Sequence, residues 1–417
     1  MLEFTYQLAI SLFAFLIKFL APFNAKIKLG VEGRKGLLEK LEHSFAALAG
    51  NRPVAWFHAA SLGEFEQGRP VIEAYRNRYP DHFILITFFS PSGYEIRKDY
   101  KVADYICYLP VDTRANARRF IRIVQPRIAF FIKYEFWFNY LRELEKTGTS
   151  IVSFSAIFSK NQSFFGPFGG FFQKMLRRYS HIFVQNQESV RLLTEIGISE
   201  ISMAGDTRFD RVKTIASQAR ELPEIASFRN QAFCIVAGSV WDADMQVLIP
   251  ALNALKGKFK AIIAPHEIKR EEIEGWRAKL GGTSILYSEM TDGQPESFDY
   301  LIIDNIGMLS SLYRYGDAAF IGGSFGAGLH NVLEAATFGL PVVFGNKSYH
   351  RFQEAADLIQ EGGAFVVRDS NEVKQIVSSW IQDSEKRLEA GKISRNYVLS
   401  KIGATERIMR KVEELMG

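Results

Sequence analysis

The sequence has few of the residues that build metal and disulfide sites. It contains two cysteines in 417 residues, Cys107 and Cys234, and they lie far apart without metal-ligand spacing. This excludes a disulfide scaffold and a metal finger, and indicates a reduced, cytosol-facing protein. An HExxH helix, a Walker loop, a GxSxG elbow and a Cys/His nucleophile pair are also missing, so no motif implies a cofactor.

A strong charge bias is missing too. The net charge is only +5, and the sequence has neither a basic run nor a nucleic-acid recognition motif, so we expect no nucleic-acid partner. Hydrophobic residues make up 47% and charged residues 23%, which is typical of a globular protein. Because 417 residues are too many for one core, we expect two domains of roughly 200 residues each.

The N-terminus carries a long apolar segment. Leu8 to Ile17 is apolar apart from Ser11, and basic residues follow from Lys18 to Lys35. A cleaved signal peptide has its charges before the apolar region, so the observed order argues against one. We predict that residues 1–24 form a short membrane anchor or an interfacial helix held by anionic headgroups, with a cytoplasmic body if the helix spans. A buried core helix is the alternative.

From Arg52 onward, apolar runs alternate with helical patterns such as 65–78 and 116–124, which predicts doubly wound parallel α/β sheets. Strand-like runs of the first half cover residues 54–59, 83–90, 105–110, 127–132, 150–155 and 181–185. The pattern lapses in the polar stretch 206–223, where we place a domain boundary. The strand-like runs of the second half cover residues 232–238, 261–265, 284–288, 300–304, 318–322, 342–345 and 364–367. Two such domains imply a cleft between them, with sites at the carboxyl ends of strands.

Residues 163–179 are rich in phenylalanine and glycine, and end near Lys174, Arg177 and Arg178. An exposed apolar insert beside basic residues would suit a lipid-facing surface. A buried hairpin or helix with a solvated basic face explains the same pattern. The sequence leaves both interpretations open.

The most informative stretch covers residues 318–345. An apolar strand leads into Gly322 and Gly323, a small-residue loop, a helical pattern at 330–338 and a second strand, which predicts a parallel β-α-β unit. A glycine loop beside a helix N-terminus suits phosphate, and Glu334, about one turn into the helix, can accept from ribose hydroxyls. The alternative is that the glycines only allow close packing and that Glu334 is solvated.

Glu64 is the candidate general base. The strand at residues 54–59 runs into Ala60-Ser61-Leu62-Gly63-Glu64, where a helix begins. Ser61 and Glu64 fit a capping box, which is the structural explanation. The functional explanation is that Glu64 takes a proton from an acceptor hydroxyl at the mouth of a cleft, while Gly63 lets the acceptor approach the backbone.

Further candidate contacts follow two strands of the second half. Gly238 and Ser239 lie at a helix start and are candidate phosphate contacts. Asp242 and Asp244 form an Asp-x-Asp pair that suits a divalent ion on a diphosphate, although two acids in a first helical turn also complement the helix dipole. His266 is either structural or a hydrogen-bond partner of a phosphate or base.

Six stretches resemble the Kdo transferases, glycosyltransferases that move 3-deoxy-D-manno-octulosonic acid (Kdo) from its CMP-activated form onto the lipid A precursor. In chain order they are WFHAASLGE (56–64), YEFWFN (134–139), GDTRFDR (205–211), AGSVW (237–241), DNIGML (304–309) and GGSFGAGLHNVLEAATFGLPVVFG (322–345). The resemblance implies a GT-B fold of two Rossmann-like domains facing across a cleft. It also implies inversion at the anomeric carbon, no essential metal, no cofactor and a membrane-bound acceptor.

The resemblance assigns roles to individual residues as well. Glu64 matches the family's catalytic base, and Ser61 and Gly63 lie on the acceptor side. The implied CMP-sugar contacts are Arg208, Ser239, His266, Gly307, Gly322, Gly323, Ser324, Asn331 and Glu334.

The chain departs from the family's pattern at four places. Lys133 stands where the family often has an acid, two residues before Glu135. Pro265 replaces an arginine and Met308 an acidic residue, and the usual Gly-Gly-His-Asn becomes Gly-Leu-His-Asn at residues 328–331. These departures bear on the finer donor contacts and the acceptor geometry rather than on the reaction class.

We therefore expect an inner-membrane enzyme, facing the cytoplasm, that transfers Kdo from CMP-Kdo to the lipid A precursor. The expected parts are a membrane helix (1–24), an acceptor domain (25–215), a CMP-sugar domain (216–395) and a last helix (396–417) that crosses back to the first domain. One alternative is another nucleotide-sugar enzyme, such as a UDP-sugar transferase or epimerase. The other is a non-catalytic membrane-bound nucleotide-sugar binding protein.

Overall fold

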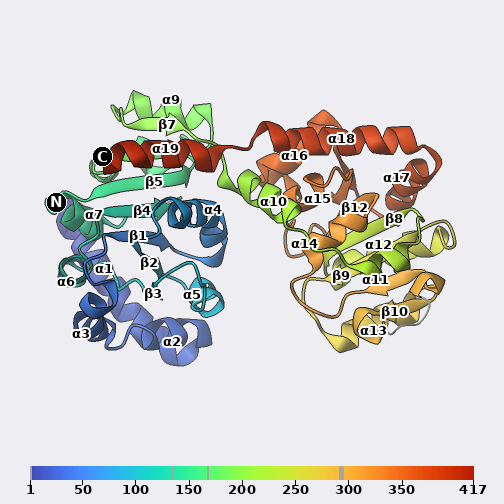
Figure 1. Cartoon of the computed structure of the whole chain (residues 1–417), viewed down its shortest axis with the longest axis horizontal. Coiled ribbons are helices and arrows are strands. Elements are labelled where there is room, and N and C mark those ends of the chain that lie inside the picture. Colours follow the sequence, from blue (N-terminus) through green and yellow to red (C-terminus); the bar gives the residue numbers. More distant parts are fainter. Residues whose placement is uncertain (1, 134, 167–168, 291–294) are drawn as a thin grey trace. The chain divides into compact units, whose positions relative to one another are not determined.

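The structure, a computed structural model, describes residues 2–133, 135–166, 169–290 and 295–417. Tyr134, at the start of one matching stretch, lies outside the described residues. The chain divides into two compact units, Met1–Arg211 with Ile402–Gly417, and Val212–Lys401. Each unit holds a parallel sheet of seven strands with helices packed on it (Figure 1). This confirms the predicted α/β class with two Rossmann-like sheets.

The first sheet has the strand order β3-β2-β1-β4-β5-β6-β7. Its strands are β1 (Val54–Ala59), β2 (Phe83–Phe88), β3 (Tyr105–Tyr108), β4 (Ile128–Ile132), β5 (Ser150–Ala156), β6 (His181–Val184) and β7 (Ile201–Met203). Every residue of β1, β2 and β4 is buried, which explains their continuous apolar runs. The sequence pattern does not predict β7, because its three residues are partly exposed and form no apolar run.

Helices pack on this sheet, and some of them begin at a side chain that caps the helix. The helices of this unit are α1 (Leu2–Leu20), α2 (Ala25–Glu32), α3 (Leu37–Ala49), α4 (Leu62–Arg78), α5 (Pro91–Arg97), α6 (Arg114–Val124), α7 (Phe138–Lys146), α8 (Gly169–Leu176), α9 (Gln187–Glu195) and α19 (Ala404–Met416). A further helix, α10 (Thr207–Ser217), begins in this unit and ends in the second. Thr113 and Asn186 accept from backbone N–H groups at the starts of α6 and α9.

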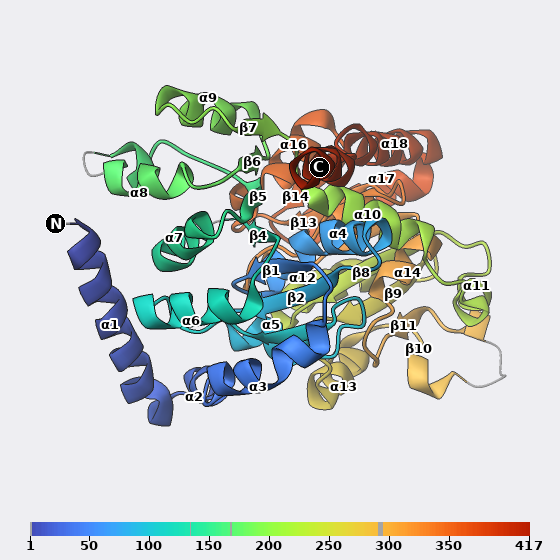
Figure 2. The ribbon, with the colours of Figure 1, turned by 60° about the vertical axis from the view of Figure 1, so that its left-hand side comes forward.

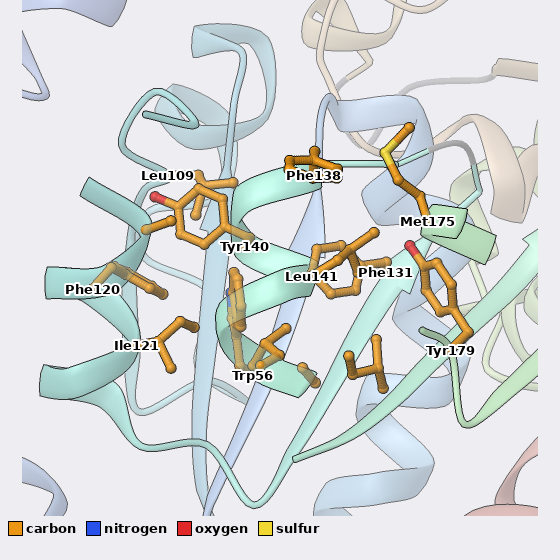
Figure 3. Packing of buried hydrophobic residues seen from close by; sticks show 14 of the residues in the cluster. Trp56, Leu109, Phe120, Ile121, Phe131, Phe138, Tyr140, Leu141, Met175 and Tyr179 are labelled. Carbon is orange, nitrogen blue, oxygen red and sulfur yellow. The ribbon is translucent and has the colours of Figure 1, made fainter. Parts of the chain in front are cut away.

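An aromatic core fills the space between the first sheet and the helices α6 and α7. The ring of Trp56 on β1 lies 5.1 Å from that of Phe120, 5.3 Å from Phe131 and 5.7 Å from Tyr140 (Figure 3). All four side chains are buried, and their tilted and edge-on contacts are those that aromatic rings prefer. This core holds the carboxyl ends of β1 and β4 in place.

The described part of the phenylalanine-rich segment belongs to the same core. Phe164 is buried, and its ring centroid lies 4.9 Å from that of Phe136. Phe171 stacks on Phe138 at 5.0 Å, and Arg178 pairs with Glu145. Phe165, Phe171 and Phe172 are only partly buried against this core, so the described residues favour the buried interpretation without hiding the whole segment. Positions 167–168 lie outside the described residues.

The second sheet has the strand order β10-β11-β9-β8-β12-β13-β14. Its strands are β8 (Cys234–Val240), β9 (Lys260–Pro265), β10 (Ser284–Leu286), β11 (Tyr300–Ile302), β12 (Ala318–Ile321), β13 (Val342–Gly345) and β14 (Ala364–Val367). Its helices are α11 (Pro223–Arg229), α12 (Asp242–Ala254), α13 (Arg270–Lys279), α14 (Leu309–Leu312), α15 (Leu333–Ala336), α16 (Gln353–Glu361), α17 (Ser370–Gln382) and α18 (Ser384–Ser400).

The stretch 318–345 forms the expected β-α-β unit, with β12 and β13 as parallel neighbours. Its helix differs from the prediction, because α15 covers only four residues. The chain before it folds back on itself: the N–H groups of Gly328 and His330 donate to the carbonyls of Gly323 and Gly322. His330, predicted to start the helix, thus helps to close the loop.

Candidate active site

The two sheets share one topological feature. In the first sheet β1 lies beside β4, and the chain continues from these strands toward opposite edges. In the second sheet the same reversal lies between β8 and β12. Loops diverge at such a reversal and leave a crevice at the carboxyl ends of the strands, where ligands bind. Glu64 follows β1, while Ser239 and Gly322 lie where β8 and β12 end, so the candidate residues occupy both switch points.

The Glu64 carboxylate caps its own helix. Its Oε2 accepts from the N–H of Ala60 at 2.6 Å and from that of Ser61 at 3.2 Å. The cap leaves the second oxygen of the carboxylate for another partner. Gly63 is exposed in the same turn, and a Cβ there would meet nothing within 4 Å. The start of α4 therefore has open space beside the candidate base.

The surroundings of Glu64 make it a better base than a solvated glutamate. Burial raises the pKa of Glu64, and the negative charge of Glu135 raises it further. The N–H of Ala60 and the side chains of His58 and Lys133 act in the opposite direction on this pKa. A carboxylate with a raised pKa binds a proton more readily at neutral pH, as a general base requires.

A buried polar cluster, absent from the sequence prediction, acts on Glu64. Nε2 of His58, on β1, lies 3.1 Å from Oε2 of Glu135, which follows β4. The indole N–H of Trp137 donates to the same carboxylate oxygen. Nδ1 of His58 lies 2.8 Å from the hydroxyl of Thr87 on β2. The histidine and the carboxylate are thus in contact at this switch point, and both act on the pKa of the candidate base.

In the second unit, Ser239 and Gly322 come together where β8 and β12 end. A Cβ on Gly322 would lie 2.3 Å from the carbonyl oxygen of Ser239, so only glycine fits there. Ser239 has a φ of 53°, and the pairing of β8 with β9 is irregular around it. A left-handed conformation outside glycine costs energy and is frequent at functional sites.

Buried Asp244 organises the glycine loop that follows β12. Its Oδ2 accepts from the N–H of Trp241 at 2.9 Å and from that of Gly323 at 2.7 Å, and its Oδ1 faces the N–H of Phe325. Asp242 accepts from an indole N–H and a glutamine amide. Both acids are committed to protein donors, and no group of three metal-ligating side chains occurs in the described part of the chain. The divalent-ion interpretation of the Asp-x-Asp pair therefore has no structural support.

An aromatic group lies at the same strand ends. The ring of His266 stacks on Trp241 at 4.4 Å and on His330 at 4.3 Å. The indole N–H of Trp241 donates to Nε2 of His330 at 2.9 Å. Burial and the neighbouring His266 lower the pKa of His330 to about 4, so this ring is neutral at pH 7 and can accept that bond. His266 is the exposed member of the group.

The other residues predicted to contact the donor lie in different kinds of surroundings. Ser324 is buried, and its hydroxyl bonds to two backbone carbonyls near β13, so it shapes the loop. The amide of Asn331 donates to Glu334 at 3.1 Å, which brings two predicted contacts together at the start of α15. Gly307 lies in an exposed loop after β11. Arg208 belongs to the first unit, where its guanidinium pairs with Asp206 at 2.7 Å.

Comparison with known proteins finds relatives along most of the chain. Residues 33–211 match the family described as 3-deoxy-D-manno-octulosonic-acid transferase (kdotransferase). A 3-deoxy-D-manno-octulosonic acid transferase of Rickettsia felis is 28% identical over 338 residues, covering 80% of this chain and 71% of the relative. One from Aquifex aeolicus is 26% identical over 326 residues, covering 76% and 83%.

Solved structures show the same fold at low identity. The UDP-GlcNAc 2-epimerase of Neisseria meningitidis bound to UDP-GlcNAc has a TM-score of 0.59 and 12% identity, covering 87% of this chain and 100% of that one. MurG of Acinetobacter baumannii has a TM-score of 0.55 and 13% identity, covering 87% and 99%. These structures establish the GT-B type of fold and nothing more. Residues 33–211 thus carry the domain of the 3-deoxy-D-manno-octulosonic acid transferases, and the sequence relatives found along most of the chain are such transferases.

Proposed function

We propose that this glycosyltransferase moves Kdo from CMP-Kdo to a hydroxyl of the lipid A precursor, at the cytoplasmic face of the inner membrane. The observation that carries the proposal is the position of Glu64. This carboxylate, whose pKa is raised, lies at the switch point of the sheet within the domain that matches the transferase family. An acceptor hydroxyl needs such a base before it can act as a nucleophile.

In the proposed reaction Glu64 removes the proton of the acceptor hydroxyl as the hydroxyl oxygen attacks the anomeric carbon of Kdo. The bond from that carbon to the CMP phosphate breaks, and CMP leaves with the bonding electrons. Attack opposite the leaving group inverts the anomeric carbon. The open space at Gly63 admits the acceptor, and the N–H of Ser61 helps to fix the base.

The donor is proposed to bind the switch point between β8 and β12. The hydroxyl of Ser239 and the amide of Asn331 can donate to phosphate, and Glu334 can accept from ribose hydroxyls. The exposed ring of His266 offers a stacking surface and a ring N–H. Gly322 and Gly323 keep the loop close to the strand ends, and Ser324 holds its shape. Arg208 and Gly307 are proposed as further donor contacts.

A Glu64→Gln variant tests the base. Glutamine can keep the capping acceptor but cannot take the proton, so we expect transfer to fall roughly 10²- to 10⁴-fold. CMP-Kdo affinity, measured by calorimetry, should change less than about two-fold, because binding does not use the base. Glu66→Gln, on the same helix, is the matched control and should stay active. Near-normal turnover of Glu64→Gln contradicts the mechanism.

The reaction itself is tested with CMP-Kdo and a tetra-acylated lipid A precursor, followed by mass spectrometry of the lipid. We expect the lipid mass to rise in Kdo units. If no Kdo is added, the assignment of donor and acceptor is wrong.

A UDP-sugar enzyme is the second candidate, because the same fold serves both chemistries. Protection from proteolysis by CMP but not by UDP favours the Kdo transferase. The reverse pattern favours the UDP-sugar enzyme. A non-catalytic nucleotide-sugar binding protein would keep its function after Glu64→Ala, which the proposed transferase would not.

A further inference from the structure

The N-terminal helix presents an apolar stripe to its surroundings. Together, α1 and the short helix η1 (Ala21–Phe23) are long and apolar enough to cross a membrane. Only 11% of this apolar stretch is buried, so the alternative that it forms a buried core helix is wrong. The most exposed large side chains recur every three or four residues and so share one face. They are Phe4, Leu8, Leu12, Phe15, Phe19 and Phe23.

The opposite face of α1 is polar near its start and bonded to the first unit. The hydroxyl of Tyr6 donates to Oδ2 of Asp112 at 2.6 Å. The amides of Gln7 and Asn139 bond to each other in both directions, at 2.8 and 3.2 Å. Asp112 and Asn139 are fully buried, and Asn139 also donates to the backbone of Asp112. These bonds fix the start of α1 to the body of the unit.

Ion pairs extend the same attachment. Oε1 of Glu3 lies 2.7 Å from Arg114, at the start of α6, and 2.9 Å from Arg142, on α7. Exposed pairs contribute little energy individually, but these lie on the same face as the buried bonds. Figure 2 shows α1 along the side of the first unit that carries α6 and α7. The helix is therefore bonded along one side to the body of the first unit.

This attachment is incompatible with crossing the membrane. Gln7 lies ~24 Å along the helix axis from Phe23, close to the ~30 Å thickness of a hydrocarbon core. If α1 crossed a bilayer, its start would lie near the far side. Asp112 and Asn139 would then lose their partners, and Glu3 would leave both arginines. In the plane of the interface, by contrast, the apolar stripe meets acyl chains while every bond to the body persists.

The other end of α1 opens onto a cationic cavity of about 780 Å³. Lys18, Lys28 and Lys35 line it, and the carboxylate of Glu32 in the same wall lies 4.0 Å from Nζ of Lys28 in an exposed ion pair. Arg34, also in its wall, donates to three backbone carbonyls and is committed to the fold. Ala21, Pro22 and Val31 supply an apolar side. Lysines above an apolar wall, beside a lipid-facing stripe, match the charge and polarity of an anionic phospholipid.

We propose that α1 lies in the plane of the membrane interface and does not span it, with an anionic phospholipid headgroup bound in the cavity at its C-terminal end. This rests on the membrane location of the proposed function and deepens it. The unit that carries Glu64 is thereby held against the lipid surface from which a lipid acceptor comes.

Cross-linking tests the attachment. Glu3→Cys with Arg114→Cys replaces the two ends of an exposed ion pair, and the native thiols Cys107 and Cys234 are buried. A short bis-maleimide should link the pair equally in detergent and in phosphatidylglycerol vesicles. Loss of the link upon vesicle binding would mean that α1 leaves the body and inserts, which overturns the proposal. Glu3→Cys with Arg122→Cys, ~12 Å further along α6, is the control and should link poorly.

Vesicle flotation tests the cavity. Lys28→Gln with Lys35→Gln should weaken binding to phosphatidylglycerol vesicles about 25-fold, from roughly five-fold per lysine, and leave phosphatidylcholine binding unchanged. The matched control removes two exposed lysines of the second unit, Lys256→Gln with Lys258→Gln, and should bind normally. Equal losses in both variants overturn the cavity. Transfer to a detergent-dispersed acceptor reports on the proposed function separately. If the protein transfers Kdo in detergent but does not bind vesicles, only the membrane inference is rejected.

Discussion

Glu64 shows how one side chain can be explained fully by structure and still be available for chemistry. Its carboxylate completes a capping box, which the spacing of Ser61 and Glu64 predicts. Burial and the charge of Glu135 raise the pKa of Glu64. Capping alone does not require this, because a solvent-exposed glutamate can cap a helix as well. The capping hydrogen bonds hold the carboxylate in one orientation, as a positioned base requires.

Glu135 therefore should control the pH dependence of transfer. The proposed base can take a proton only when it is deprotonated, so we expect activity to fall as the pH drops through the raised pKa of Glu64. Glu135→Gln removes the neighbouring negative charge, lowers this pKa and should shift the acid limb of the kcat profile to lower pH by about one unit or less. The control is Glu66→Gln, since Glu66 is not among the groups that shift this pKa. An acid limb that stays in place in Glu135→Gln would show that the two carboxylates are not coupled.

Gly322 and Gly326 make a second matched pair. A Cβ at Gly322 would lie 2.3 Å from the backbone of Ser239, whereas one at Gly326 would lie 3.6 Å from its nearest neighbour. Gly322→Ala should displace the loop and weaken CMP-Kdo binding at least ten-fold, while Gly326→Ala should bind within about two-fold. Equilibrium binding by calorimetry measures both. Unchanged affinity in Gly322→Ala would place the donor elsewhere.

The sequence alone could not predict the partners of these residues. His58 and Glu135 come from strands far apart in the chain, and only the order β1 beside β4 brings them together. Trp241, Asp244 and His330 meet for the same reason, at β8 and β12. Local patterns report neighbours along the chain, whereas a buried polar network depends on strand order, which short-range patterns do not encode.

At the scale of an element, Asp244 is the link between α12 and the glycine loop. Asp244→Ala leaves buried N–H groups of Trp241 and Gly323 without their acceptor, so we expect the second unit to lose about 1–3 kcal/mol of unfolding free energy. Asp242→Asn, at the more exposed acid of the pair, keeps an acceptor for the indole N–H of Trp276 and should cost about 1 kcal/mol or less. Urea unfolding followed by hydrogen exchange in β8 measures both. Equal costs would show that Asp244 does not hold the loop.

The same bonds predict the result of metal removal. With both acids committed to protein donors, a chelator should leave the rate of Kdo transfer within about 20% of its untreated value. Dialysis against EDTA followed by the transfer assay is sufficient. Loss of activity that returns with Mg²⁺ would restore the divalent-ion interpretation.

Most strands were predictable because parallel strands covered on both faces leave continuous apolar runs, as β1 and β13 do. The exceptions have local causes. β7 is partly exposed, and the helix predicted at 330–338 shortens to α15, while the chain before it closes into a loop through the N–H groups of Gly328 and His330. A helical pattern at the edge of a glycine loop therefore gives the helix but not its bounds.

At the scale of the whole molecule, the first unit is built from both ends of the chain. After α18 the chain re-enters it at Ile402, and α19 packs on α4. The buried side chains of Ile408, Met409 and Val412 join the core cluster of β1, β2 and β4. The carbonyl of Met416 accepts from Arg127 at 2.6 Å. The domain with the candidate base is thus incomplete without the last helix.

A cavity in this interface should destabilise the first unit selectively. Ile408→Ala removes a fully buried side chain and should cost about 2–5 kcal/mol, whereas Leu388→Ala, on the exposed side of α18, should cost almost nothing. Because the chain has two units, a single melting temperature would average their responses. Hydrogen exchange separates them: Ile408→Ala should speed exchange in β1 and β4 but not in β8 and β12. Faster exchange in both sheets would show that the units unfold as one, and α19 would then stabilise the whole chain rather than the unit it completes.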